Sequence, residues 1–114
     1  MKHTIDAQDK KIGRVASEAA SILMGKNSPS FRKNISGESE VLILNASKAD
    51  VTLKRKKETE YVRYSGYPGG LKIENMSSYM KRHGFAGVIR KAVQGMMPKN
   101  KLHKGRMKRL VINE

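Results

Sequence analysis

The chain contains no cysteine and only three histidines. Without cysteine it can form neither a disulfide framework nor a thiolate metal site, and this composition is consistent with a reducing compartment. His3, His83 and His103 are scattered without the spacing of metal ligands, so we expect surface or packing roles for them. The sequence therefore predicts no metal site and no cofactor.

Long apolar segments are absent as well. No run approaches the ~20 residues of a membrane-spanning helix, and residues 1–6 turn polar too soon for a signal peptide. We therefore expect no membrane partner. The length of 114 residues predicts a single domain over residues 1–114, with no room for a second.

Acidic residues are few. Ten Asp and Glu stand against 24 Lys and Arg, which gives a formal net charge of +14 and a pI near 10.3. Such a chain attracts polyanions, so nucleic acid is the expected partner. Asp50, Glu58, Glu60 and Glu74 stand apart in sequence, whereas metal-dependent hydrolysis needs clustered carboxylates. With no Ser/His/Asp or Cys/His arrangement and no dinucleotide fingerprint, the sequence predicts no enzyme, no catalytic residue and no small-molecule substrate.

The first half of the chain predicts a strand, a helix and a second strand. Residues 3–5 suit a short strand, and apolar residues at helical spacing predict a helix over about residues 13–25. The continuous apolar run at residues 41–44 is typical of a strand covered on both faces, as in a parallel sheet with helices on either side. We expect a turn or one helical turn at residues 45–50, and a strand continuing over residues 51–53.

The second half predicts two helices and a last strand. Gly84 is placed to end the first helix, whose inner face comprises Met76, Tyr79, Met80 and His83. The second is expected over residues 87–97, and its apolar stripe comprises Val88, Ile89, Ala92, Val93, Met96 and Met97. Gly95 costs this helix about 1 kcal/mol relative to alanine, which indicates close packing or the approach of a ligand. Residues 110–112 suit a short strand or a hydrophobic anchor.

Residues 61–72 point most directly to nucleic acid. Three of the four tyrosines fall here, interleaved with Arg63 and Lys72, and the pair Gly69 and Gly70 follows them. Tyrosine stacks on bases or bonds to sugar and phosphate, arginine forks onto phosphate, and glycine lets the backbone approach a sugar-phosphate chain. The alternative is a Pro-Gly turn beside half-buried tyrosines.

Two basic segments extend this pattern. Residues 54–57 are four consecutive Lys or Arg that lead into a tyrosine-rich strand expected over residues 60–64. Such runs are often only solvated loops, but here they predict one continuous RNA-facing surface. Residues 99–109 hold six Lys or Arg and no acid, so self-repulsion predicts poor order without a polyanion.

Four blocks of the sequence resemble the universal large-subunit ribosomal protein family thirteen, in its bacterial form. The blocks occur in family order and cover nearly the whole chain. The most specific is Gly95-Met96-Met97-Pro98-Lys99-Asn100 after Lys91-Ala92-Val93. The others are residues 6–26 with Lys11-Ile12-Gly13-Arg14-Val15-Ala16-Ser17 and Gly25-Lys26, residues 41–46 with Lys48 and Val51-Thr52, and residues 64–72.

The resemblance implies a three-layer α/β/α sandwich around a four-stranded, largely parallel sheet, with a basic loop and a basic C-terminal extension. It also implies a structural role in the large ribosomal subunit, with binding to large-subunit (23S-type) ribosomal RNA, contacts to neighbouring large-subunit proteins and support of early assembly. The expected location is the ribosome in a bacterial cytoplasm, or an organellar matrix if the source is an organelle. No homo-oligomer is expected.

Charge pattern and resemblance together predict the RNA-facing residues. They are Arg14, Lys26, Lys54, Arg55, Lys56, Lys57, Arg63, Tyr64, Tyr67, Gly69, Gly70, Lys72, Lys91, Lys99, Lys101, Lys104, Arg106, Lys108 and Arg109.

A second function stays open from the residues, that of a stand-alone regulator that binds one messenger RNA and represses its translation. Such a protein would prefer one free RNA by a large ratio, whereas a ribosomal protein should show modest preference outside its assembly context. The chain also departs from the family pattern. Both termini are short, Leu53 stands where glycine is common, and Leu102-His103-Lys104 stands where relatives often have Leu-Gly-Arg.

Overall fold

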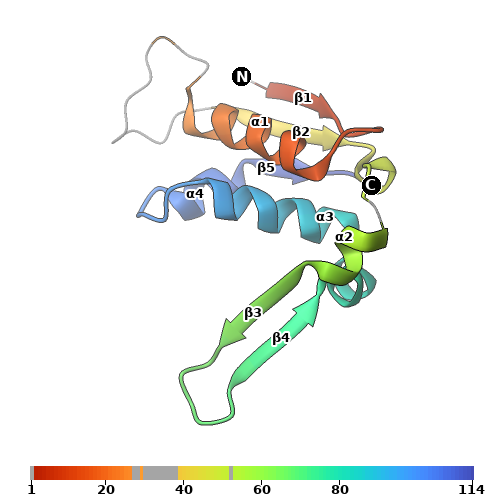
Figure 1. The fold of residues 1–114 in the computed structure, drawn as a ribbon. Helices are drawn as coiled ribbons and strands as arrows, with labels where there is room; N and C mark the ends of the chain where they lie inside the picture. The colour runs from red at the N-terminus through yellow and green to blue at the C-terminus, as the bar shows by residue number, and fades with distance from the viewer. Residues whose placement is uncertain (1, 27–28, 30–38, 52) are drawn as a thin grey trace.

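The computed structural model describes residues 2–26, 29, 39–51 and 53–114, with only the backbone at residues 53–55 (Figure 1). The polar sequence of residues 27–39, with Pro29 and Gly37, predicts a loop, and most of this segment lies outside the described ranges. In chain order the elements are β1 (Lys2–Asp6), α1 (Ile12–Met24), β2 (Glu40–Leu44), the 3-10 turn η1 (Ala46–Lys48), α2 (Leu53–Glu58), β3 (Glu60–Tyr64), β4 (Leu71–Asn75), α3 (Met76–Met96), α4 (His103–Lys108) and β5 (Leu110–Ile112). Within the described ranges, no helix combines the length and apolar character needed to cross a membrane.

Three parallel strands form the central sheet, in the order β1-β2-β5. The connections from β1 to β2 and from β2 to β5 both move in the same direction across the sheet. Right-handed crossovers therefore place α1 and α3 on the same face. The two helices accordingly pack against each other (Figure 1). Their apolar residues form one core with Ile5, Val41, Ile43 and Leu110, which point from the three strands toward the helices.

On the opposite face of this sheet, the described part of the chain places no helix. Val111 is exposed, and its neighbours Leu42 and Leu44 are only partly buried. The expectation that residues 41–44 are covered on both faces is therefore wrong, because both crossover helices lie on one side. The mixed α/β class is confirmed. However, the described residues form a three-stranded parallel sheet and a separate two-stranded hairpin, not one four-stranded sheet between two helical layers.

Residues 50–58 also differ from expectation. A single parallel bridge joins Lys11 to Asp50, Val51 lies outside any strand, and α2 begins at Leu53, so the strand expected over residues 51–53 is wrong at its described residues. Thr52 lies outside the described ranges. The basic run at residues 54–57 belongs to a helix, not to a solvated loop. Lysine, arginine and glutamate are good helix formers, and α2 consists almost wholly of them. No apolar periodicity marks this helix in the sequence.

Gly84 divides α3 into two arms, which confirms the two helices expected on either side of it. Its backbone angles are φ 71° and ψ −175°, a combination essentially restricted to glycine. Beyond this break, the Glu114 carboxylate accepts a hydrogen bond of 3.0 Å from the Ala86 N–H. A residue from the far end of the chain thus caps the second arm where the helix dipole favours negative charge.

The basic tail is folded in the structure, so the expected poor order is wrong. It forms α4, in which Met107 is buried and the Arg106 side chain is only 2% exposed. Burial of these two residues holds the segment against the core and offsets the repulsion among its charges. Lys104 and Lys108 remain exposed on the other side of the helix.

Candidate nucleic-acid interface

The tyrosine-rich stretch forms a β-hairpin whose two faces differ in chemistry. β3 pairs antiparallel with β4 in a register that sets Arg63 opposite Lys72. Directly opposed residues point to the same face, and successive residues alternate. One face, here the polar face, therefore comprises Tyr61, Arg63, Lys72 and Glu74. The other, here the apolar face, comprises Val62, Tyr64, Leu71 and Ile73. β4 was not predicted, although its alternation of apolar and charged residues is typical of a strand.

Like charges sit opposite each other on the polar face. Arg63 and Lys72 form a cross-strand pair, and both side chains are exposed. Such a pair destabilises a hairpin unless an anion lies between the charges. The acid on this face, Glu74, already forms an ion pair with Arg82 near the end of the first arm of α3. The polar face thus has two cations available for phosphate.

Aromatic contacts hold the base of the hairpin against α3. The Tyr61 and Tyr79 rings meet edge to face with centroids 5.1 Å apart. The Lys91 ammonium lies 4.9 Å from the centroid of the Tyr61 ring and 5.4 Å from that of Tyr79. Because Tyr61 belongs to the polar face, that face is turned toward the second arm of α3. Lys91 therefore lies on the same side of the molecule as Arg63 and Lys72.

A hollow of about 440 Å³ lies beside the second arm of α3, next to Lys91. It is lined by Lys91, Gln94, Gly95, Lys99 and His103, with no acid among them. An imidazole nitrogen of His103 lies 3.3 Å from the Gln94 carbonyl oxygen. Two ammonium groups and a histidine around an open space suit a phosphate group. The hollow together with Arg63 and Lys72 is called the basic surface below.

Lys91 and Lys99 belong to the RNA-facing set predicted from the sequence, whereas Gln94 and His103 do not. The spacing of Lys91, Gln94 and Gly95 at i, i+3 and i+4 marks one helix face and could have indicated this site. His103 carries no comparable signal, because α4 brings it there from another element. Of the two explanations for Gly95, close packing is wrong, since no described atom beyond its neighbours and the backbone of its own helix lies within 4 Å of where a Cβ would stand.

Gly95→Ala is therefore expected to separate stability from RNA binding. Alanine should raise the free energy of unfolding by about 0.5–1 kcal/mol, because glycine is a poor helix former. The added methyl group narrows the floor of the hollow, so affinity for a large-subunit RNA transcript should fall. Urea unfolding and filter binding on the same preparation test both effects. Unchanged affinity in the stabilised variant would contradict a role for the hollow.

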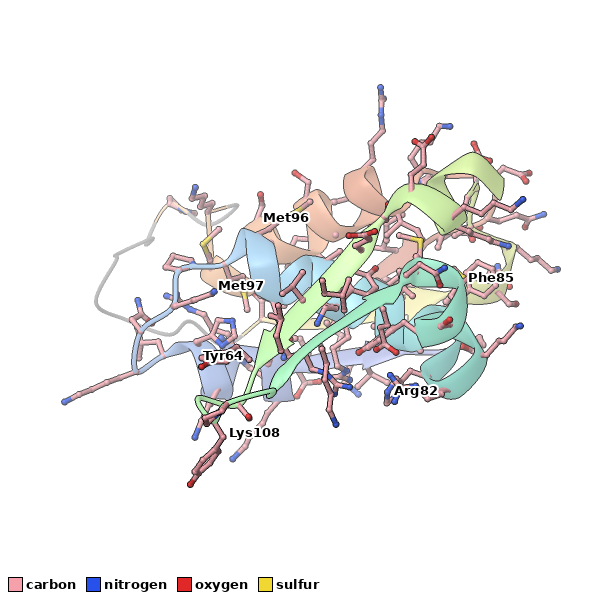
Figure 2. The ribbon with its side chains drawn as sticks, turned by 60° about the horizontal axis from the view of Figure 1, so that its bottom comes forward. Tyr64, Arg82, Phe85, Met96, Met97 and Lys108 are labelled. Carbon is pink, nitrogen blue, oxygen red and sulfur yellow. The ribbon has the colours of Figure 1, made fainter. Side chains whose placement is uncertain are left out.

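The loop between the strands is shaped by its glycines. Gly66 and Gly69 have φ of 88° and 74°, and a side chain at Gly70 would collide with Ser65. The turn geometry alone thus explains the glycine pair, and its contact with RNA stays a prediction. Tyr67 at the tip is 74% exposed. The half-buried tyrosine of the alternative interpretation is found at Tyr61, while Tyr67 and Tyr64 are exposed. Figure 2 shows Tyr64 on the hairpin.

The other predicted residues are spread over the molecule. Arg14 and Lys26 are exposed at opposite ends of α1, away from the hairpin (Figure 1). Lys56 lies over the Phe85 ring, 5.7 Å from its centroid, and Lys57 is exposed. The side chains of Lys54 and Arg55 lie outside the described part of the structure. The exposed tail cations are Lys99, Lys101, Lys104 and Lys108.

Arg106 and Arg109 differ from the exposed cations, and only for Arg106 does burial overturn the predicted RNA contact, which for Arg109 stays a prediction. Arg106 is buried and therefore not accessible to RNA, so we withdraw it from the RNA-facing set. Arg109 donates to the carbonyls of Leu23 and Ser39 at 3.3 and 3.1 Å, which ties the end of α1 to the start of β2. Desolvation and the nearby Arg106 lower the pKa of its guanidinium, which still stays protonated at neutral pH. The hydrogen bonds of Arg109 thus stabilise the packing of α1 beside β2.

Metal-assisted chemistry has no visible centre in the described ranges. They contain no group of three or more His, Cys, Asp or Glu side chains that could hold a metal ion. The acids named in the sequence are not gathered either, because Asp50 pairs with Lys11 at 3.0 Å and Glu74 pairs with Arg82.

Comparison with known proteins gives one consistent result. The family model described as Ribosomal protein L13 matches residues 1–114. The large ribosomal subunit protein uL13 of Pelotomaculum thermopropionicum is 40% identical over 110 residues, covering 96% of this chain and 76% of that protein. The uL13 of Prochlorococcus marinus strain MIT 9301 is 41% identical over 108 residues, covering 95% and 75%. That of Natranaerobius thermophilus is 41% identical over 110 residues, covering 96% and 76%.

Proposed function

Since the chain belongs to the ribosomal protein L13 family, we propose that it is a structural, non-catalytic component of the large ribosomal subunit. In this proposal it acts as a single domain in the ribosome of the cytoplasm, bound to large-subunit ribosomal RNA and adjacent to other large-subunit proteins. It neutralises phosphates and fixes neighbouring RNA segments relative to one another during early assembly.

The pairing of Arg63 with Lys72 is the observation that supports RNA binding best. A cross-strand pair of cations weakens a hairpin that already projects from the body of the protein. A phosphate between the two charges turns this repulsion into attraction and releases counterions from the RNA. Lys91 and Lys99 place further cations on the same side.

Sedimentation tests the proposal directly. Tagged protein from a cell lysate should migrate with the large subunit in a sucrose gradient and stay there after a high-salt wash. Absence from the subunit peak would overturn the proposal. In that case a preferred free messenger RNA should be sought, as expected for a translational regulator.

A double variant tests the hairpin tip and the polar face together. Tyr67→Ala with Arg63→Ala should lower incorporation into large subunits when it competes with the unaltered protein, because an aromatic and a cationic contact are lost. Both residues are exposed, so the thermal midpoint of the isolated protein should stay unchanged. Lys2→Ala is the control, since it removes an exposed cation from β1. Equal incorporation of both variants would remove the hairpin tip from the site.

A further inference from the structure

The apolar face of the hairpin is exposed, and no described residue of the chain covers it. Val62 is 60% exposed, Tyr64 65%, Leu71 56% and Ile73 56%. The register places these four side chains together on one side of a two-stranded ribbon. A contiguous apolar surface of this kind marks an interaction site, and a two-stranded hairpin is at best marginally stable without cover on one face.

RNA does not match this face. It contains no Lys or Arg, and its charged member at the base of the hairpin is Glu60, which repels phosphate. Three of its four apolar side chains are aliphatic, so they have no ring to stack on a base. The reverse side of the same strands, with Arg63 and Lys72, already offers the phosphate-binding chemistry. RNA therefore fits the side of the hairpin that carries Arg63 and Lys72, whereas Tyr64, predicted from the sequence to face RNA, lies on the other side.

A second copy of the chain does not match either. Each copy has a formal net charge of +14, so two copies repel each other over the whole surface. Contact between two identical apolar faces would also bring the two Glu60 carboxylates to the same interface. A different protein, with an aliphatic patch bordered by a cation, satisfies both the apolar side chains and Glu60.

We propose that the apolar face of the β3–β4 hairpin docks on an aliphatic patch of a neighbouring protein in the large subunit, with a cation of that protein near Glu60. This inference rests on the proposed function and deepens it. The hairpin then acts as a two-sided spacer, with RNA on its polar face and protein on its apolar face.

Neighbouring residues on opposite faces allow a matched cross-linking test. A photoreactive phenylalanine derivative is placed at Ile73 in one variant and at Lys72 in another, and large subunits are irradiated after purification. The Ile73 probe should form a cross-link to one protein at an aliphatic segment, and the Lys72 probe should form one to RNA. A cross-link from Ile73 to RNA, to a second copy of this chain or to nothing, while Lys72 labels RNA, would overturn the inference.

A second pair of variants measures the energetic weight of this face. Val62→Ser with Ile73→Ser should lower competitive incorporation by about tenfold, because two aliphatic side chains lose their burial on docking. RNA affinity of the isolated protein should not change. Thr4→Ala with Val111→Ser, on the open face of the central sheet, serves as control. Normal incorporation of the hairpin variant overturns the inference, whereas loss of the unaltered protein from the subunit peak overturns the proposed function instead.

Discussion

Gly84→Ala is expected to lower the free energy of unfolding by about 2–4 kcal/mol. The backbone at this position lies in a region that costs residues with a side chain about 1–3 kcal/mol. An added Cβ would also collide with the Glu114 carboxylate. The carboxylate must then move away from the Ala86 N–H, and loss of such a cap costs about 1 kcal/mol. Urea unfolding followed by circular dichroism measures the effect.

Gly13→Ala provides the matched control. Gly13 lies in α1, and no atom lies within 4 Å of where its Cβ would stand. Alanine there should stabilise the protein by up to about 1 kcal/mol, because it restricts the unfolded chain and favours the helix. Both substitutions replace glycine by alanine, and they should shift the midpoint of urea unfolding in opposite directions. Equal midpoints would show that the break in α3 tolerates an ordinary residue.

Apolar residues at helical spacing, and glycines at the ends of such segments, correctly predicted the helices that show these patterns. The apolar spacing between Gly13 and Gly25 predicts α1, and Gly25 ends that helix with φ 83°. Gly84 likewise separates the two arms of α3 as expected. By contrast, α2 has no apolar stripe, so the periodicity of the sequence does not predict a helix there. Met96, expected in the apolar stripe, is 45% exposed, while the adjacent Met97 is buried (Figure 2).

The burial of the strand at residues 41–44 depends on the order of the strands, which a local sequence pattern does not contain. The apolar run at residues 41–44 suits a strand with two covered faces, but its coverage depends on the order of the strands in the sheet. The same limit applies to the candidate site. Lys91 and Arg63 were predicted separately from charge and spacing. Their placement on one side follows from the contact of Lys91 with Tyr61, which joins residues distant in sequence. Arg106 was taken for an RNA contact because a sequence does not distinguish a solvated arginine from a buried one.

Charge reversal on the polar face should have the largest effect on RNA binding. Arg63→Glu with Lys72→Glu is expected to lower affinity for a large-subunit RNA transcript by on the order of 100-fold at 0.1 M salt. The slope of log affinity against log salt should become shallower by roughly 1.5–2, since two phosphate contacts are lost. Filter binding over a salt series measures both quantities. The fold should persist, because the two side chains are exposed and the cross-strand pair again holds two like charges.

Lys2→Glu with Lys10→Glu separates local contact from net charge. This control changes the formal net charge of +14 by the same four units, but at exposed residues of β1 and the turn after it. It should lower affinity only slightly. Arg63→Glu alone gives a further distinction, because the introduced carboxylate would face Lys72 as an ion pair and stabilise the hairpin by about 0.2–1 kcal/mol while weakening RNA binding. If the control lost as much affinity as the polar-face variant, the overall charge of the protein, not the basic surface, would determine binding.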